Sequence, residues 1–336
     1  LVIETKTGAI KAMANFPTYD PSKYYEVKDP NLFTNGVVSN ASEVGSIMKT
    51  LTAAAALDSG VVTRNQTYYD PAQYVIDEAT VRNVEEDGGP GTKDVADILQ
   101  LSLNTGASWL LMQMGDGEIN SKARTSWHKY LTDNYRFGQV TGVEQSYENP
   151  GVVPDPNEGF GLNIKFANTA FGQGQTETLI QMGAAMNAVL NGGTYYRPYL
   201  VDGFVGSDGQ VQYQKATVLR EGVVSAEVSK TMQELMQYVI QKNYPFYLQT
   251  SIRPEYSFGG KTGTAQIANP SGGYYEDKFN GTFLGYVGGN EPQFTIVTEF
   301  EEPVVTGYAG SKAAAPLYFD IANMLIDDFN VTPRAN

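Results

Sequence analysis

The sequence of 336 residues has 37 acidic and 23 basic side chains, a net charge of -14, no cysteine and a single histidine, His128. These counts exclude disulfides, cysteine nucleophiles and histidine-rich metal centres, and we expect neither a metal nor another cofactor. A chain this acidic is also a poor nucleic-acid binder, because contacts to phosphate need clustered cations.

The chain opens directly on Leu1-Val2-Ile3, without Met or a signal peptide. No run of 18 apolar residues is present that would span a membrane. We therefore expect one domain over residues 1–336, with any pedestal or membrane-anchoring segment lying upstream of this chain.

The first quarter of the chain alternates between short strand and helix patterns. Residues 1–14 predict a β-hairpin around a turn at Lys6-Thr7-Gly8. A Pro-containing loop covers 17–30, and the alanine-rich stretch from Ser46 to Ser59 predicts a helix that Gly60 ends. Residues 64–92 are polar and Gly-rich, which is typical of loops with short strands.

The middle of the chain is predicted to be all-helical. The helices are expected over residues 95–114, 121–134, 177–190 and 225–241. The Pro- and Gly-rich stretch 145–161 resembles a linker, but the charge pattern does not change across it, so it predicts a loop within one domain.

The last third of the chain changes character. It has strand patterns over 260–268, 281–287 and 293–301 and a closing helix over 313–329. Strands at both ends with helices between them predict an α/β (α+β) fold. Its sheet has five mainly antiparallel strands from the two termini and is covered by helices on both faces.

Three short patterns follow one another along the chain. They are Ser46-Ile47-Met48-Lys49, Ser102-Leu103-Asn104 and Lys261-Thr262-Gly263-Thr264. In this order they match the nucleophile, second-serine and Lys-Thr-Gly elements of penicillin-interacting serine enzymes. Any one of them alone is a weak signal.

Two of the patterns also occur a second time, and their context separates the copies. Lys6-Thr7-Gly8 falls in the predicted hairpin turn, and Ser126-Trp127-His128-Lys129 falls in the middle of a helix with a partly exposed face. By contrast, Gly259-Gly260 precede Lys261, and such glycines would let another chain or a ligand approach the strand closely. We therefore assign the chemistry to Ser46, Lys49 and Lys261.

Ser46 could simply be a helix N-cap, a common role for serine. A capping serine favours Glu or Gln three residues later, yet this chain has Lys49 there, near the positive end of the helix dipole. Residues three apart share a helix face, so the amine of Lys49 can reach the hydroxyl of Ser46. To act as a base Lys49 must be neutral. Its pKa would then have to fall from about 10.4 by about three units, through burial and a second cation such as Lys261.

The chain resembles the transpeptidase domain of class B penicillin-binding proteins over nearly its whole length. The stretches that carry the resemblance are residues 1–13, Glu43-Val44-Gly45-Ser46, 52–57, 170–174, 259–266, 280–286 and Ala314-Ala315-Pro316. Val44, Ile47-Met48 and Leu103 depart from the pattern common among relatives, but none of them removes a reacting group.

The resemblance implies a role for each motif residue. Ser46 is the nucleophile, Lys49 its base, and Ser102 the proton shuttle to the leaving amine. Asn104 would bond the substrate amide and Lys49. Lys261, Thr262, Gly263 and Thr264 would form the edge that binds the terminal carboxylate, and the backbone N–H groups of Ser46 and Thr264 would form the oxyanion hole.

The resemblance also implies a substrate and a setting. The expected reaction joins a stem peptide ending in D-alanyl-D-alanine to an acceptor amine through an acyl-enzyme, which β-lactams would also form. The expected location is extracytoplasmic, with an N-terminal transmembrane helix anchoring the full-length protein. A membrane glycosyltransferase and other cell-wall synthesis proteins are the expected partners.

Several alternatives stay open on the sequence alone. A D,D-carboxypeptidase differs only in using water as the acceptor, and a β-lactam sensor or a non-catalytic scaffold would share the fold. A β-lactamase is disfavoured by the long interval between Ser102 and Lys261. A Ser-His-Asp hydrolase through His128 has no Gly-x-Ser-x-Gly elbow in its favour.

Overall fold

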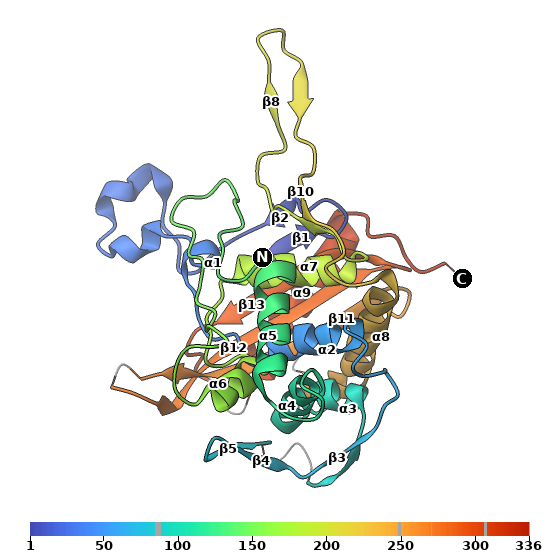
Figure 1. Cartoon of the computed structure of the whole chain (residues 1–336). Coiled ribbons are helices and arrows are strands. Elements are labelled where there is room, and N and C mark those ends of the chain that lie inside the picture. The colour runs from blue at the N-terminus through green and yellow to red at the C-terminus, as the bar shows by residue number, and fades with distance from the viewer. Residues whose placement is uncertain (85–88, 248–249, 270, 306–307, 336) are drawn as a thin grey trace.

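The computed structural model describes residues 1–84, 89–247, 250–269, 271–305 and 308–335. At its centre is a five-stranded antiparallel sheet (Figure 1). In spatial order its strands are β11 (Ser257–Ala268), β12 (Tyr274–Gly288), β13 (Pro292–Phe300), β1 (Val2–Glu4) and β2 (Ile10–Ala12). This confirms the prediction of one sheet built from strands of both termini.

Alternation along the strands separates two hydrophobic cores, one on each face of the sheet. On β12, Leu284 and Tyr286 enter the first core, whereas Phe283 and Val287 enter the second. The same alternation holds on β1, where Ile3 belongs to the first core and Val2 to the second. Both faces are therefore buried, as the sequence predicted.

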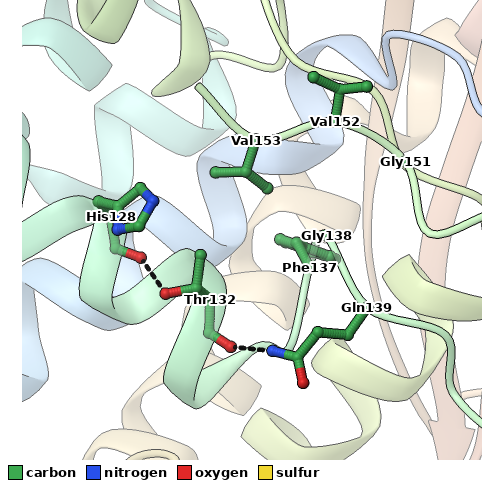
Figure 2. A pocket seen from close by; sticks show the side chains of 8 residues that line it. All are labelled: His128, Thr132, Phe137, Gly138, Gln139, Gly151, Val152 and Val153. Carbon is green, nitrogen blue, oxygen red and sulfur yellow. Dashed lines mark hydrogen bonds between the residues drawn. The ribbon is translucent and has the colours of Figure 1, made fainter. Parts of the chain in front are cut away.

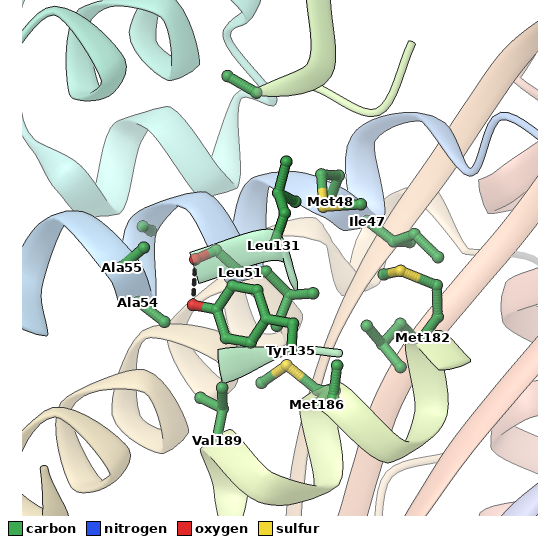
Figure 3. Close-up of a cluster of buried hydrophobic side chains, with 14 of the residues drawn as sticks. Ile47, Met48, Leu51, Ala54, Ala55, Leu131, Tyr135, Met182, Met186 and Val189 are labelled. Atoms are coloured by element: carbon green, nitrogen blue, oxygen red, sulfur yellow. Dashed lines mark hydrogen bonds between the residues drawn. The ribbon is translucent and has the colours of Figure 1, made fainter. Parts of the chain in front are cut away.

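The first face packs against helices α2 (Met48–Asp58), α7 (Leu179–Leu190) and α8 (Ala226–Asn243). Figure 1 looks onto this face, with α2 in front of the sheet. Small residues bring the layers close, since a Cβ on Gly183 of α7 would lie 2.9 Å from Leu1 and 3.1 Å from Ile3. Figure 3 shows the methionines and alanines between α2 and α7.

The second face packs against α9 (Ala315–Asp328) through aromatic rings. Phe283 of the sheet stacks on Tyr318 of α9 with ring centroids 4.3 Å apart. The next residue of α9, Phe319, contacts the rings of Tyr247 and Phe258. The hydroxyl of Tyr318 donates to Tyr286 O at 2.6 Å and lies 3.1 Å from Gly259 O. This helix therefore covers the sheet with an aromatic layer.

The middle of the chain is not all-helical, which corrects that prediction. It contains helices α3 (Val95–Gln100), α4 (Asn104–Gln113), α5 (Ser121–Lys129) and α6 (Leu162–Thr169). Among the described residues it also contains two-stranded sheets, β7 (Tyr195–Tyr196) with β10 (Val218–Arg220) and β8 (Gly203–Val205) with β9 (Val211–Tyr213). The short strands predicted around residues 64–92 are present as β3 (Tyr68–Asp70) with β6 (Gly91–Lys93) and β4 (Gln73–Ile76) with β5 (Ala79–Arg82). The β8–β9 hairpin projects away from the body of the protein (Figure 1).

Local differences from the predicted helices have physical causes. The single helix expected over 95–114 is two helices, because Ser102 between them has φ +60°, which no α-helix accommodates. Short elements also occupy predicted loops or flank the longer helices. They are the 3₁₀ helices η1 (Pro21–Glu26), η2 (Pro30–Phe33), η3 (Gly45–Ile47) and η6 (Tyr244–Phe246), the π-helical turns η5 (Tyr130–Asn134) and η7 (Gly310–Ala314), and α1 (Gly36–Ser39). In the described part of the chain, no helix combines the length and apolarity needed to cross a bilayer.

Candidate active site

Ser46 lies in the tight turn η3 that leads into α2. No side chain caps η3 or α2, so Ser46 is not an N-cap. Gly45 has φ +62°, and its N–H donates to Gly172 O at 3.0 Å. A Cβ on Gly172, which has φ +87°, would lie 2.0 Å from Gly45 O. Two glycines in contact thus hold the turn that presents Ser46.

Lys49 connects this turn to the second-serine segment. Its side chain is 0% exposed. Nζ lies 2.8 Å from Ser46 Oγ, and it donates to Ser102 Oγ at 3.1 Å and to Ser102 O at 2.5 Å. One buried amine therefore contacts both serine hydroxyls that the sequence singled out.

Ser102 occupies the break between α3 and α4 in a left-handed conformation, φ +60°. This conformation costs a residue with a Cβ roughly 1–2 kcal/mol, so its surroundings must hold it. Leu103 is the N-cap of α4 and offers no capping side chain. The left-handed turn carries the Ser102 hydroxyl to Lys49, which a continuous helix would not do.

Strand β11 carries the third motif along the open edge of the sheet. Lys261 is 1% exposed, and its Nζ donates to Ser102 Oγ and to Thr262 O, each at 2.9 Å. Added Cβ atoms at Gly259 and Gly260 would lie 2.2 Å from the ring of Tyr286 and 2.4 Å from the ring of Phe283. The prediction that these glycines admit a chain or ligand is therefore wrong, since they make room for rings of the neighbouring strand.

The turn that carries Ser46 contacts β11 at Gly263. A Cβ there would lie 2.2 Å from Thr282 Oγ1 and 2.9 Å from Val44 O, and Thr282 Oγ1 donates to Val44 O at 3.1 Å. Glycine at position 263 thus lets the segment before Ser46 lie directly on the strand. The contact fixes the position of Ser46 relative to Lys261.

The remaining motif residues lie around this centre. Asn104 is the first residue of α4, and its Nδ2 donates to Arg82 O at 3.0 Å. Thr264 Oγ1 accepts from Gly310 N at 3.2 Å. In the register with β12, Lys261 pairs with Leu284 of the first face, whereas Thr262 pairs with Phe283 of the second. Lys261 and the two threonines therefore belong to alternate sets along the edge strand.

Ser46, Lys49, Ser102 and Lys261 form one continuous chain of hydrogen bonds. Two buried amines share the Ser102 hydroxyl in it. A hydroxyl oxygen can accept two such bonds and still donate its own proton. The arrangement can therefore accept a proton from Ser46 and deliver one elsewhere, which acyl transfer requires.

Two neighbouring acids beside the Ser46 turn, Glu43, which is half-buried, and Glu177, which is buried, were not predicted. Glu43 Oε1 accepts from Gly174 N at 2.8 Å and from Tyr274 Oη at 3.0 Å, and burial raises the pKa of Glu43. Glu177 is 1% exposed, and burial followed by the charge of Glu43 raises its pKa well above the usual range. Within the described residues neither Glu177 oxygen has a hydrogen-bond partner. An acid at a helix start is ordinary, so no signal in the sequence marked Glu177 as buried.

The second copies of the motifs lie away from the centre. Lys6 is exposed and pairs with Glu291 at 2.9 Å, and Ser126 lies within α5 with an exposed Lys129 three residues later. His128 lines a shallow cavity with Thr132, Phe137 and Val153 (Figure 2). The described residues that line it include neither a serine nor a carboxylate, so no Ser-His-Asp arrangement forms there.

Comparison with known proteins gives one consistent family. The family model described as penicillin binding protein transpeptidase domain matches residues 1–323. Stage V sporulation protein D of Bacillus subtilis is 30% identical over 100% of this chain and 50% of its own length. Penicillin-binding protein PbpB of Mycobacterium tuberculosis is 30% identical over 98% of this chain and 48% of its own. The chain thus spans about half the length of the curated relatives it matches.

Solved structures give the same result. Penicillin binding protein 3 of Mycobacterium tuberculosis in complex with aztreonam matches with a TM-score of 0.85 and 29% identity, over 99% of this chain and 72% of that one. The complex of the same protein with ampicillin also has a TM-score of 0.85 and 29% identity, over 100% of this chain and 73% of that one. The fold is therefore that of a penicillin-binding transpeptidase domain.

Proposed function

Since the chain belongs to the penicillin-binding protein transpeptidase family, we propose that it is a peptidoglycan D,D-transpeptidase with Ser46 as its nucleophile. The observation that carries the proposal is the single hydrogen-bond chain joining Ser46, Lys49, Ser102 and Lys261. Relatives named peptidoglycan D,D-transpeptidase, from Mesostigma viride and Buchnera aphidicola, support the reaction class.

Acylation begins with proton transfer from Ser46 Oγ to Lys49 Nζ, which lie 2.8 Å apart. The Lys49 side chain is buried and shares Ser102 with a second buried amine, and both conditions disfavour an ammonium at that position. The Ser46 oxygen then attacks the carbonyl carbon of the penultimate D-alanine. The bond from Oγ to carbon forms and the bond from carbon to the terminal D-alanine nitrogen breaks.

The leaving nitrogen needs a proton, and Ser102 is placed to supply it. Its oxygen accepts from Lys49 and from Lys261, so its own proton is available to the leaving amine and can be replaced from Lys49. In the second half-reaction an acceptor amine attacks the ester carbon, loses a proton along the same route and frees Ser46 Oγ. Protons balance over the two steps.

The substrate's terminal carboxylate would bind at the open edge of β11. Lys261 supplies charge from one set of side chains, and the hydroxyls of Thr262 and Thr264 come from the alternate set. Because Lys261 and the two threonines point to opposite sides of β11, a carboxylate can contact all of them only at the edge of the strand. Gly263 lies between the two threonines there. We assign the oxyanion hole to the N–H groups of Ser46 and Thr264, and contact with the substrate amide to Asn104.

We also propose the setting of the reaction. The stem peptide and acceptor amine lie in the cell wall, so the domain would act outside the cytoplasmic membrane, held by an upstream transmembrane helix. A membrane glycosyltransferase that makes the glycan strands is the partner we propose, together with other cell-wall synthesis proteins. β-Lactams would acylate Ser46, as aztreonam and ampicillin complexes exist for the similar protein from Mycobacterium tuberculosis.

The experiment is acylation by a fluorescent penicillin followed by intact-mass and peptide mapping. The expected result is one stable adduct on Ser46, no adduct in Ser46→Ala, and acylation at least about 10³-fold slower in Lys49→Met. Ser126→Ala is the matched control and should label like the wild type. A wild-type protein that gains no adduct would sink the proposal, whereas rapid turnover of the adduct would mean a β-lactamase.

An assay with a D-alanyl-D-alanine peptide then decides the acceptor. Transfer to an added amine is the expected product for a transpeptidase. Hydrolysis alone, which releases D-alanine and the peptide shortened by one residue with no amine product at any amine concentration, would mean a D,D-carboxypeptidase. Penicillin labelling without any peptide turnover would mean a sensor or scaffold.

A further inference from the structure

Resting on the proposed function, we propose that Asp70 is a positioning residue for the second serine, acting on Ser102 through Thr105 and Asn83. None of these three residues belongs to the three motifs of the proposed site. They come from β3, from the end of β5 and from the first turn of α4. These elements lie together below the sheet in Figure 1.

Asp70 is 1% exposed, and its carboxylate collects hydrogen bonds from several donors. Thr105 Oγ1 lies 2.8 Å from each carboxylate oxygen, Asn83 Nδ2 donates to Oδ2 at 3.1 Å, and Ala72 N donates to Oδ1 at 2.7 Å. Burying a carboxylate costs folding free energy unless hydrogen-bond donors such as these compensate for the lost water. These hydrogen bonds connect the end of β3, the end of β5 and the first turn of α4 through the Asp70 carboxylate.

The network replaces the missing cap of α4. The N-cap residue Leu103 offers no side-chain acceptor to the orphan N–H groups of the first turn. Asn83 Oδ1 accepts from Thr105 N at 3.0 Å, so a side chain from a distant strand does the capping. Asp70 holds Asn83 in that orientation, and its charge lies near the positive end of α4.

The first turn of α4 fixes Ser102, which lies three residues before Thr105. On one side Lys49 Nζ holds the Ser102 carbonyl, and on the other the α4 end is attached to residues 82 and 83 of the β5 end. Ser102 has the left-handed backbone that α3 and α4 would not adopt by themselves. Both attachments are therefore needed to keep its hydroxyl between the two amines.

The test uses Thr105, because Thr105→Val removes only the hydroxyl, which lies 2.8 Å from both Asp70 oxygens and from Asn83 Oδ1. Acylation is followed by intact mass with a penam nucleus that has no acylamino side chain, so that contact between Asn104 and a substrate amide does not enter the measured rate. We expect acylation about 10-fold slower in Thr105→Val and within twofold of the wild type in Thr105→Ser, which keeps the hydroxyl. Thr295→Val is the matched control. Thr295 is equally buried and donates to Asn187 Oδ1 at 2.8 Å, on the sheet, and its acylation rate should stay at the wild-type value.

A double-mutant cycle separates positioning from a general loss of stability. If Thr105 acts through Ser102, the variant with both Ser102→Ala and Thr105→Val should acylate as fast as Ser102→Ala alone, within twofold. A further 10-fold loss in that background would overturn the proposal, as would a Thr105→Val rate equal to the wild type or a Thr105→Ser rate as low as Thr105→Val. Failure of the proposed function would look different, because the wild type itself would then gain no adduct on Ser46.

Discussion

The two faces of the central sheet are packed with different kinds of side chain. The first face, under α2, α7 and α8, combines alanines and methionines with buried polar groups such as Lys49, Gln181 and Asn187. The second face, under α9, is packed with aromatic rings, including Phe258, Phe283, Tyr318 and Phe319. In the proposed active site, Ser46, Lys49, Ser102 and Lys261 lie on the first face, whereas Thr262 and Thr264 belong to the alternate set of the edge strand β11.

The difference shows how a fold can remain stable although its active site buries polar groups at a cost in folding free energy. Burying an amine such as Lys49 or Lys261 removes it from water at a cost of several kcal/mol unless hydrogen bonds compensate. Aromatic side chains bury large areas and gain further from edge and stacked contacts. The second face thus supplies stability that the first face gives up to position polar groups closely.

The largest expected effect that would test this division is on the second face. Phe319→Ala removes a ring that is 0% exposed and contacts the rings of Tyr247, Phe258 and Phe283. We expect a loss of about 3–5 kcal/mol in the free energy of unfolding, measured by urea denaturation. The acylation rate of the folded fraction should stay within twofold of the wild type. A slow rate in fully folded protein would show that the two faces are not independent.

A smaller loss of stability is expected from a substitution at the backbone contact between Gly172 and Gly45. Gly172→Ala places a Cβ 2.0 Å from Gly45 O and forces a positive φ on alanine. We expect a loss of about 2–3 kcal/mol in stability and roughly 10-fold slower acylation, since the turn that carries Ser46 must shift.

Gly192→Ala is the matched control for that variant. Gly192 has φ +92°, and nothing lies within 4 Å of an added Cβ. It should lose only the roughly 1 kcal/mol of backbone strain and acylate normally. Equal effects of the two substitutions on acylation would contradict the role given to the contact between Gly172 and Gly45.

The same contrast explains how much of the molecule could be predicted from its sequence. The strands at the two termini were predictable because alternation marks each of them and their two buried faces leave long apolar runs, as in residues 283–287. The meeting of Ser46, Lys49, Ser102 and Lys261 was predictable because the spacing and residue types of the three motifs are specific in combination. The order and register of the strands are long-range properties and followed only from the structure.

What could not be predicted depends on contacts between distant segments. The break at Ser102 was hidden because Ile98, Leu99 and Leu110 continue one helical pattern across it. Lys49, Asn83 and Asp70 hold that turn from elsewhere in the chain. The burial of Glu177 was hidden for the same reason, since the acid next to it, Glu43, is distant in sequence.

A pH experiment sharpens the comparison on the first face. Burial, and next the charge of Glu301, raise the pKa of Glu299 to about 7. In the unfolded chain this carboxyl ionises near its usual value of 4.5, so between pH 4.5 and 7 the folded state holds more protons. Stability should therefore fall as pH rises through this window, by at most about 3 kcal/mol from this group. Urea denaturation of Glu299→Gln should show a flatter dependence on pH, and curves parallel to the wild type would refute the assignment.

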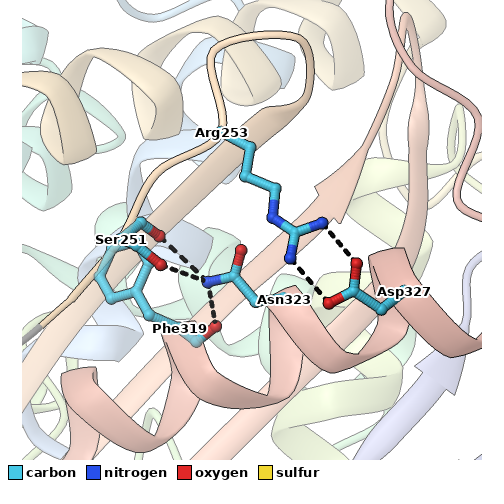
Figure 4. Close-up of polar contacts among 5 residues, drawn as sticks. All are labelled: Ser251, Arg253, Phe319, Asn323 and Asp327. Atoms are coloured by element: carbon cyan, nitrogen blue, oxygen red, sulfur yellow. Dashed lines mark hydrogen bonds and ion pairs between the residues drawn. The ribbon is translucent and has the colours of Figure 1, made fainter.

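The smallest effect is expected at the exposed rim of the second face. Arg253 forms a two-pronged ion pair with Asp327 of α9, with nitrogen–oxygen distances of 2.6 and 2.7 Å, while Asn323 bonds Ser251 beside it (Figure 4). Because water surrounds this pair, Arg253→Met should lower the melting temperature by at most about 2 °C, and 1 M NaCl should remove the difference. The stability of the second face would then come from its rings and not from its surface charges. A larger, salt-resistant loss would instead make this ion pair part of what holds α9 to the sheet.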